Sequence, residues 1–454
     1  MAQLESKYQK YAEYQDSGVE WLGEIPSHWF LKKHKYIAEF SKGKNPELLF
    51  DNYSDGLYPY LSMDSLRGKA DSKYAEYKKG LVLVQDNQPL IIWDGSNSGE
   101  FVLGKKGLLS STMASASLIY EIQDQYYWYL CVCIEPEMRK HATGMGIPHV
   151  NGEELRGIVL SLPTINEQIQ IANFLDHETA KIDSLIVKQE KLIELLKEKR
   201  QAVISHAVTK GLNPNVKMKD SGVEWLGEVP EHWAVSLIKY QCKEITDGAH
   251  ISPDLENGEH FFVSIRDIKD GIINFEDALL TSDKSYQYLI HTGCKPFAGD
   301  ILFSKDGTIG QTAITPDDIN FVVASSLIIL RPKYSRVSSE FLDLLLRSDV
   351  VQEQVESFVK GAALRRLSIQ NLLKIWGAFP PRDEQSKIVN FVLSQLDKYK
   401  NLELNAEKQV ELLRERRTAL ISSAVTGKID VRDWQNPNLK NTANNNEAQT
   451  EQQV

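Results

Sequence analysis

A chain of 454 residues is longer than a single hydrophobic core usually allows, so at least two globular units are expected. Its composition, 42% apolar and 25% charged, is that of an ordinary globular protein. No apolar run approaches the roughly 18 residues that a membrane helix needs, and the charged start, MAQLESKYQK, lacks a signal-peptide core. These features predict a cytoplasmic protein that makes no contact with a membrane.

The formal net charge of −10 counts against strong binding of nucleic acid, because Lys and Arg side chains that neutralise phosphates supply most nonspecific affinity for DNA. Charge acts locally, over about 10 Å at ordinary ionic strength, so an acidic protein can still present a basic face. We therefore expect this chain to bind DNA weakly alone and to need partners. The four cysteines fit neither a disulfide framework nor a zinc site, which predicts free thiols.

An internal repeat organises the chain. Residues 16–29, DSGVEWLGEIPSHW, recur at 220–233 as DSGVEWLGEVPEHW. Later in each half, LPTINEQIQIANFL from Leu162 aligns with FPPRDEQSKIVNFV from Phe379, and ELLKEKRQAVISHAVT from Glu194 aligns with ELLRERRTALISSAVT from Glu411. The chain is therefore a tandem duplication.

Between these matched segments the two halves differ almost everywhere. Two copies that share a frame and differ in content are expected if each half reads a different target while being held in the same way. The divergent stretches contain apolar runs of strand length bounded by Gly, Asp and Ser, which predicts mixed domains of strands and short helices. These runs are residues 81–84, 90–93, 116–120, 300–303 and 326–330.

The matched segment at the end of each half has the periodicity of a long helix. The first helix is expected to start at Pro163 and to stop at Gly211, and the second to run from Pro381 to Gly427. Their charges nearly balance, which suits packing against another helix better than lying along phosphates. We predict an α+β fold in which two long antiparallel helices separate two domains in a pseudo-twofold tandem repeat. The alternative is that each helix packs only on its own domain.

These patterns predict seven segments. They are a leading segment at 1–29, a first domain at 30–161, a helical spacer at 162–213, a second leading segment at 214–233, a second domain at 234–379, a second spacer at 380–428 and a disordered tail at 429–454.

The leading segments contain Trp, His and Glu, a combination that could suggest a site. We favour a structural role, in which these residues anchor each domain to a helix end. The anchors would be Trp21, Leu22 and Trp29, with their copies Trp225, Leu226 and Trp233.

The residues that catalysis would need are missing from the sequence. Gly99 and Gly104-Lys105 have phosphate-loop spacing, but Lys106 stands where a Ser or Thr must reach magnesium. No glycine-rich adenosylmethionine loop, methyltransferase tetrapeptide, nuclease carboxylate set or metal-ligand spacing is found. We therefore predict a chain without catalytic residues, metal or cofactor.

Two polar regions in each divergent stretch are candidates for contacts with DNA. One is the turn that follows an apolar strand, at 93–99 and at 305–310, and the other is the segment before each long helix. Small residues let a backbone approach a ligand closely, and Arg can bind guanine through two hydrogen bonds. An ordinary turn and a solvated charged surface are the respective alternatives. The candidates for DNA binding are Ser96, Asn97, Lys105, Lys106, Lys140, Thr143, His149, Arg266, Lys305, Thr308, Lys360, Arg365 and Arg366.

With its duplicated leading segment, variable domains and repeated ELLxExR…AVT helix end, the chain resembles the specificity subunits of type I restriction-modification systems over nearly its whole length. The resemblance implies two target-recognition domains, held apart by conserved helices, that each read one half of a bipartite site in double-stranded DNA. It assigns no base-contacting residue, because target domains vary between members.

The resemblance also implies partners. Two modification subunits would methylate adenine at N6 with adenosylmethionine, and restriction subunits would use ATP and magnesium, so these cofactors are expected on the partners and none on this chain. The alternatives from other classes are a catalytic DNA methyltransferase or nuclease and a helical scaffold that does not contact DNA.

Overall fold

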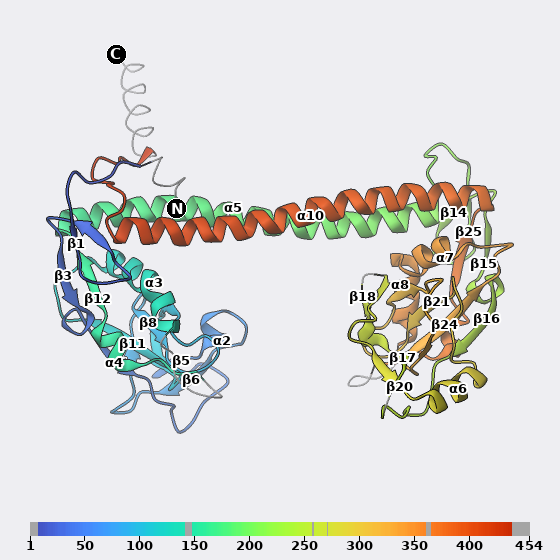
Figure 1. The fold of residues 1–454 in the computed structure, drawn as a ribbon, viewed down its shortest axis with the longest axis horizontal. Coiled ribbons are helices and arrows are strands. Elements are labelled where there is room, and N and C mark those ends of the chain that lie inside the picture. Colours follow the sequence, from blue (N-terminus) through green and yellow to red (C-terminus); the bar gives the residue numbers. More distant parts are fainter. Residues whose placement is uncertain (1–7, 141–147, 257, 270, 360–364, 438–454) are drawn as a thin grey trace, which may run out of the picture. The chain divides into compact units, whose positions relative to one another are not determined.

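The computed structural model describes residues 8–140, 148–256, 258–269, 271–359 and 365–437 (Figure 1). The chain forms two compact units. Unit 1 consists of Met1–Lys188 and Gln409–Val454, and unit 2 consists of Gln189–Lys408. The two long helices, α5 (Ile165–Lys210) and α10 (Arg382–Val425), run through both units, so each unit contains one part of each helix.

Unit 1 contains two four-stranded sheets. One has the order β6-β5-β10-β7 and includes the parallel pair β5 and β10, and the other is the antiparallel sheet β4-β11-β8-β9. Two further antiparallel pairs, β1 with β2 and β3 with β12, hold the leading segment. The strands are β1 (Tyr14–Asp16), β2 (Glu24–Pro26), β3 (Phe30–Lys33), β4 (Ala38–Lys42), β5 (Leu57–Leu61), β6 (Lys73–Glu76), β7 (Leu83–Val84), β8 (Pro89–Ile92), β9 (Phe101–Leu103), β10 (Gly107–Leu109), β11 (Met113–Leu118) and β12 (Val159–Leu162). The helices are η1 (His34–Tyr36), α2 (Met63–Leu66), α3 (Asp124–Lys140) and α4 (Gly152–Gly157).

Unit 2 contains the antiparallel sheet β16-β24-β21-β22 and the sheet β20-β17-β23, in which β17 and β23 run parallel. Its antiparallel pairs are β13 with β14, β15 with β25, and β18 with β19. The strands are β13 (Met218–Asp220), β14 (Glu228–Pro230), β15 (Ala234–Leu237), β16 (Cys242–Asp247), β17 (His260–Val263), β18 (Ile268–Lys269), β19 (Ile272–Ile273), β20 (Leu279–Thr281), β21 (Ile301–Ser304), β22 (Thr312–Ile314), β23 (Phe321–Val323), β24 (Leu327–Pro332) and β25 (Trp376–Phe379). The helices are η2 (Ile238–Gln241), η3 (Ile265–Asp267), α6 (Asp283–His291), α7 (Ser339–Leu346), α8 (Asp349–Phe358) and α9 (Ile369–Leu372).

The two units share their strand order even where their sequences differ. The order β4-β11-β8-β9 in unit 1 corresponds to β16-β24-β21-β22 in unit 2, and β6-β5-β10 corresponds to β20-β17-β23 with the same parallel pair. The duplication therefore extends through the divergent stretches. This finding confirms the predicted α+β tandem repeat.

Strand β21 shows why the apolar runs have no polar face. Ile301 and Phe303 pack into a core formed with α7 and the long helices, while Leu302 points to a second core shared with β17 and β23. Because successive side chains of a strand point to opposite faces, a strand covered on both sides is apolar at every position. Helix α7, which is buried at every position except Glu340, supplies the cover on the helical side.

The leading segment of unit 1 is anchored to the start of α5, as predicted. The Trp29 indole donates a hydrogen bond to Glu167 (3.1 Å), and a His28 ring nitrogen lies 3.0 Å from the same carboxylate. The amide of Gln168 donates to the Pro163 carbonyl oxygen (2.9 Å), which explains the repeated Glu-Gln pair as a helix-start device.

Unit 2 repeats this anchor with fewer contacts. A His232 ring nitrogen lies 2.7 Å from Glu384, and Gln385 donates to Pro380 at 2.9 Å. Leu226 and Trp233 are buried, but Trp225 leaves 43% of its surface exposed. The prediction that Trp225 is an anchor is therefore wrong.

The two long helices are antiparallel within each unit. In unit 1, Asp183 of α5 pairs with Arg417 of α10 (2.8 Å), and Ser161, which precedes α5, donates to the last residue of α10, Val425 (3.2 Å). In unit 2, Lys197 of α5 lies 3.4 Å from Glu403 of α10. Residue numbers rise along one helix as they fall along the other, which confirms the antiparallel prediction.

The beginning of the tail that was expected to be disordered is packed in unit 1. Ile429 and Val431 are buried, the Asp430 amide donates to the Gln9 carbonyl oxygen (2.7 Å), and Trp434 contacts Phe174. The Trp434 ring packs on Phe174 of α5, and the start of the tail is ordered, which corrects the prediction for residues up to 437. Residues 438–454 lie outside the described residues.

Three further observations concern cysteines, membranes and metals. All four cysteines are free, as predicted. None of the described helices has both the length and the apolar composition that spanning a bilayer requires. Among the described ranges, no three His, Cys, Asp or Glu side chains gather as metal ligands would.

Candidate nucleic-acid interface

In unit 1 the two predicted DNA-contact regions meet. Asp94, in the turn after β8, forms a bridge with His149, in the segment before the long helix, and their side chains lie 2.6 Å apart. The backbone reinforces this junction, because Gly95 donates to Pro148 (3.0 Å) and Val150 donates to Trp93 (2.9 Å). Residues that are 55 positions apart in the sequence thus form one surface.

Unit 2 forms the same junction with a different side chain on the aspartate. Asp306, in the turn after β21, bridges to Arg366, whose Nε lies 3.2 Å from the Asp306 carboxylate. The Leu367 amide donates to the Lys305 carbonyl oxygen at 2.9 Å, as Val150 does to Trp93. In each unit an aspartate of the turn therefore holds the segment before the long helix. The exposed side chain that pairs with this aspartate is His149 in unit 1 and Arg366 in unit 2.

A second charge pair at the junction is reversed between the units. In unit 1, Lys42 at the end of β4 lies 2.9 Å from Asp94 and 5.7 Å from the ring of Trp93. In unit 2, Asp247 occupies the position of Lys42, and Lys305 occupies that of Trp93. Both strands thus end in a charged residue whose partner stands in the adjacent turn.

Lys305 is only 2% exposed, and its Nζ is 2.5 Å from each carboxylate oxygen of Asp247. A charge so deeply buried needs such a partner, and moving it to a DNA phosphate would leave Asp247 unpaired. This placement favours a structural role for Lys305 over the predicted contact with DNA.

The side chains of Lys42 and His149 keep Asp94 ionised. Burial raises the pKa of the Asp94 carboxyl, but the hydrogen bonds from His149 and Lys42 outweigh burial and hold the pKa below its ordinary value. The ionised aspartate can therefore accept hydrogen bonds from both side chains at neutral pH.

Sequence reasoning missed a pair of glycines at the base of each junction. Gly43 follows β4 and Gly248 follows β16, and a Cβ on either would overlap a backbone carbonyl oxygen, that of Ser110 or Ala324. Counted from the matched leading segments, Gly248 comes one residue later in its unit than Gly43 does, because β16 has an irregularity between Cys242 and Glu244. A gap placed there would have aligned the two glycines.

The other predicted residues of unit 1 are distributed around the junction or on separate loops. Ser96 is exposed in the turn after β8, and Asn97 faces Arg67 when its amide is oriented so that the oxygen accepts (2.9 Å). Lys105 and Lys106 are exposed on the separate β9–β10 turn, and Lys140, at the end of α3, pairs with Glu137 (2.6 Å). Thr143 lies outside the described residues.

In unit 2, Thr308 is exposed in the turn after β21, and Arg365 is exposed and paired with Glu356. Arg266 is exposed in η3, beside Ile265, whose amide donates to the Ser326 hydroxyl (3.2 Å); the Ser326 carbonyl accepts the Lys305 amide. Arg266 thus adjoins the junction. Lys360 lies outside the described residues.

Two units that share a frame and a junction, but present different exposed side chains on it, define a recognition protein with two reading surfaces. Residues 26–195 and 238–414 match the family described as "type I restriction modification DNA specificity domain". These segments make up more than half of the chain, and the chain belongs to this family.

Curated relatives match most of the chain. The chain is 28% identical to the MjaVIII specificity subunit of Methanocaldococcus jannaschii over 420 residues, which cover 90% of this chain and 95% of the relative. It is 24% identical to the EcoBI specificity subunit of Escherichia coli, with 87% of this chain and 84% of the relative covered. Both relatives are subunits of type I restriction enzymes.

A solved structure from work on complex assembly and conformational transition of the type I R-M system has the same fold. Its TM-score is 0.65 at 14% sequence identity, and the match covers 88% of this chain and 98% of that chain. Family membership makes this chain a non-catalytic specificity subunit with a role in DNA recognition. The catalytic and scaffold alternatives are not favoured.

Proposed function

We propose that each unit reads one half of a bipartite DNA site and that the chain thereby directs adenine N6 methylation and restriction by its partner subunits. The observation that carries this proposal is the repeated junction, with Asp94 and His149 in one unit and Asp306 and Arg366 in the other. A shared frame with exchanged surface side chains is what two readers of different sequences require. Arg366 could bind guanine through two hydrogen bonds, whereas the imidazole of His149 could not match that pattern.

The proposal includes two modification subunits, bound to this chain in equivalent ways, and restriction subunits. Its support is a set of exposed apolar side chains at matching positions of α5 and α10, aligned through Glu194 and Glu411. Exposed apolar groups that recur on both helices favour two copies of one partner. The pairs are Leu185 with Leu402, Val187 with Leu404, and Leu195 with Leu412.

Cofactors are assigned to these partners in the proposal: adenosylmethionine to the modification subunits, and ATP with magnesium to the restriction subunits. The assembly would act on cellular DNA in the cytoplasm.

DNA binding by the purified chain together with its companion methyltransferase tests the proposal. We expect tight, sequence-dependent binding only when both proteins are present, because this chain alone is acidic. The methyltransferase without this chain is the control. Equal sequence preference in that control would contradict the proposal.

The assignment of Arg365 and Arg366 has its own test. Replacing both by Ala should weaken recognition of the half-site read by unit 2 by about 1–3 kcal/mol for each lost base contact, and leave the other half-site unaffected. Lys374→Ala, an exposed charge change in the same unit, is the control. Unchanged methylation of the full site would reject the assignment.

A further inference from the structure

We propose that unit 1 carries a binding site for a DNA backbone phosphate, formed by Lys44 and Lys79 at a pocket beside the candidate interface. This inference rests on the proposed function, because it assumes that unit 1 faces DNA. It adds a contact that holds the duplex in place without reading its sequence.

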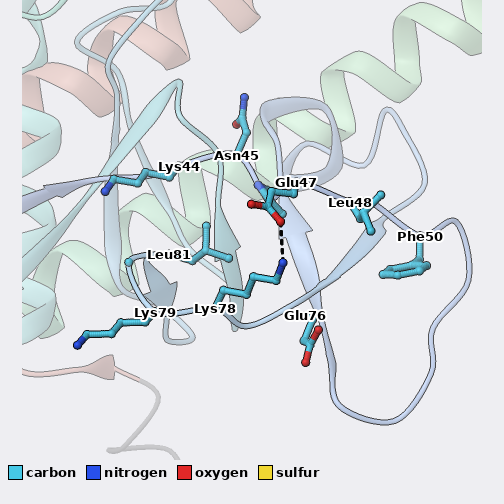
Figure 2. Close-up of a pocket in the computed structure, with 11 residues that line it drawn as sticks. Lys44, Asn45, Glu47, Leu48, Phe50, Glu76, Lys78, Lys79 and Leu81 are labelled. Carbon is cyan, nitrogen blue, oxygen red and sulfur yellow. Dashed lines mark hydrogen bonds and ion pairs between the residues drawn. The ribbon is translucent and has the colours of Figure 1, made fainter.

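The pocket lies between the loop that follows β4 and the loop that follows β6, and it has a volume of about 260 Å³ (Figure 2). Glu47 and Lys78 form an ion pair across it, with the Lys78 Nζ 2.7 Å from the carboxylate. Leu48 and Phe50 line one end. Because Glu47 neutralises the charge of Lys78, this lysine is not available to bind an anion.

The other two lysines are the ones available to a ligand. Lys44 and Lys79 are exposed, and within the described residues neither has an ion pair or a side-chain hydrogen bond. Figure 2 shows both extending to the same side of the pocket, away from Leu48 and Phe50. Two ammonium groups on one side without a carboxylate between them suit an anion, and a phosphate takes Lys as a point-charge partner.

The turn between β6 and β7 leaves room for that anion. Leu81 donates to the Lys78 carbonyl oxygen (3.0 Å), which closes the turn, and Gly80 adopts a φ of +98°. The Lys44 Nζ lies 4.0 Å from the position that a Cβ on Gly80 would occupy. The Lys44 ammonium group therefore lies close to the turn that carries Lys79.

The position of the pocket identifies DNA as the source of the phosphate. Lys44 is two residues beyond Lys42, the residue that pairs with Asp94 at the junction. Two residues span at most about 7 Å, which is close to the axial rise of two base pairs. A duplex that contacts the Asp94–His149 junction would therefore bring a backbone phosphate within reach of Lys44.

Unit 2 lacks this site. The residue after Gly248, which occupies the place of Lys44 in the repeat, is Ala249, and it is buried in a bridge with Ala324. The Lys44–Lys79 pair is therefore not repeated in unit 2.

The test is the salt dependence of DNA affinity for the chain assembled with its companion methyltransferase. For Lys44→Ala/Lys79→Ala we expect roughly tenfold weaker binding and a slope of log K against log salt that is smaller by about 1 to 2, because each phosphate contact contributes about 0.9. The sequence of the methylated motif should not change. Lys44→Arg/Lys79→Arg should restore binding, and Lys33→Ala/Lys188→Ala removes two exposed charges elsewhere in unit 1 as the control.

The outcomes distinguish this inference from the proposed function. Unchanged affinity and slope in the Ala variant, with normal sequence-specific binding by the wild-type assembly, would overturn the phosphate site alone. Loss of methyltransferase from the Ala variant would also overturn it, because the lysines would then contact protein. A wild-type assembly without sequence preference would overturn the proposed function and this inference together.

Discussion

At the scale of single residues, one aspartate in each unit joins two segments that are distant in the sequence. Asp94 accepts from His149 and Lys42, and Asp306 accepts from Arg366. The pre-helix segment thereby gains a fixed position relative to the turn after the strand. An exposed side chain held in this way has fewer conformations to lose when it binds DNA.

Removing Asp306 should weaken the binding of DNA without lowering the stability of the fold. Arg366 is about half exposed, and exposed ion pairs contribute only about 0–1 kcal/mol, so Asp306→Ala should leave the free energy of unfolding nearly unchanged. DNA affinity of the assembly should fall by roughly tenfold, because Arg366 loses its orientation. Asp317→Ala, an exposed carboxylate in the same unit, is the control. The positioning role would be refuted if Arg366→Ala weakened binding and Asp306→Ala did not.

The glycines at the base of the junctions make a prediction about stability. In Gly43→Ala or Gly248→Ala the new Cβ would overlap a backbone carbonyl oxygen, so the strand end or the facing loop must move. We expect a loss of about 1–3 kcal/mol in the free energy of unfolding for each, measured by urea denaturation. Gly157→Ala has no atom within 4 Å of its Cβ and should be nearly neutral. Equal effects at Gly43 and Gly157 would contradict this packing.

At the scale of elements, the leading segment is fastened to the start of a long helix in each unit, but not equally. Buried Glu167 accepts from the Tyr11 hydroxyl (2.6 Å) and the Trp29 indole (3.1 Å), and it also contacts His28. Its copy Glu384 is partly exposed and contacts His232. The Trp233 indole nitrogen has no partner among the described residues.

This difference predicts unequal costs for the same substitution. Glu167→Ala leaves two buried donors unsatisfied, at about 1–3 kcal/mol each, and should destabilise unit 1 strongly. Glu384→Ala should cost about 1 kcal/mol or less. Limited proteolysis of the full chain, with cleavage sites assigned to each unit, would measure both effects. Equal protection of the two units in both variants would refute the assigned role of Glu167.

Elements with a strong apolar signal were predictable from sequence. The expected run at 300–303 is β21 (Ile301–Ser304), and the run at 90–93 overlaps β8 (Pro89–Ile92). Strand β5 (Leu57–Leu61) was missed, because four of its five residues are only half-buried and the strand has no clear apolar face. Its parallel pairing with β10 depends on distant contacts that a local pattern does not contain.

The candidate interface was predictable by region but not by residue. The turns that contain Asp94 and Asp306 were found because both follow an apolar strand, and the segments that contain their partners because both precede a matched helix. Neither aspartate was itself predicted as a site residue. Burial of Lys305 was not predictable, because its partner Asp247 lies 58 positions away and replaces a lysine of unit 1. Charge reversal between repeats leaves no common motif to detect.

At the scale of the whole molecule, the chain repeats one architecture with two surfaces. The strand order is the same in both units, while the junction carries His149 in one and Arg366 in the other. Burial on both faces restricts strands such as β21 to apolar residues, whereas exposed turn residues can change at little cost in stability. This division explains how two halves can diverge in target and keep one fold.

The most direct measurement is methylome sequencing of a methylation-free host that produces this chain with its companion methyltransferase, compared with the methyltransferase alone. The account predicts a new bipartite N6-methyladenine motif only when this chain is present. It further predicts that Arg365→Ala/Arg366→Ala relaxes one half of that motif and leaves the other half intact. Absence of any motif, with both proteins folded and associated, would contradict the account.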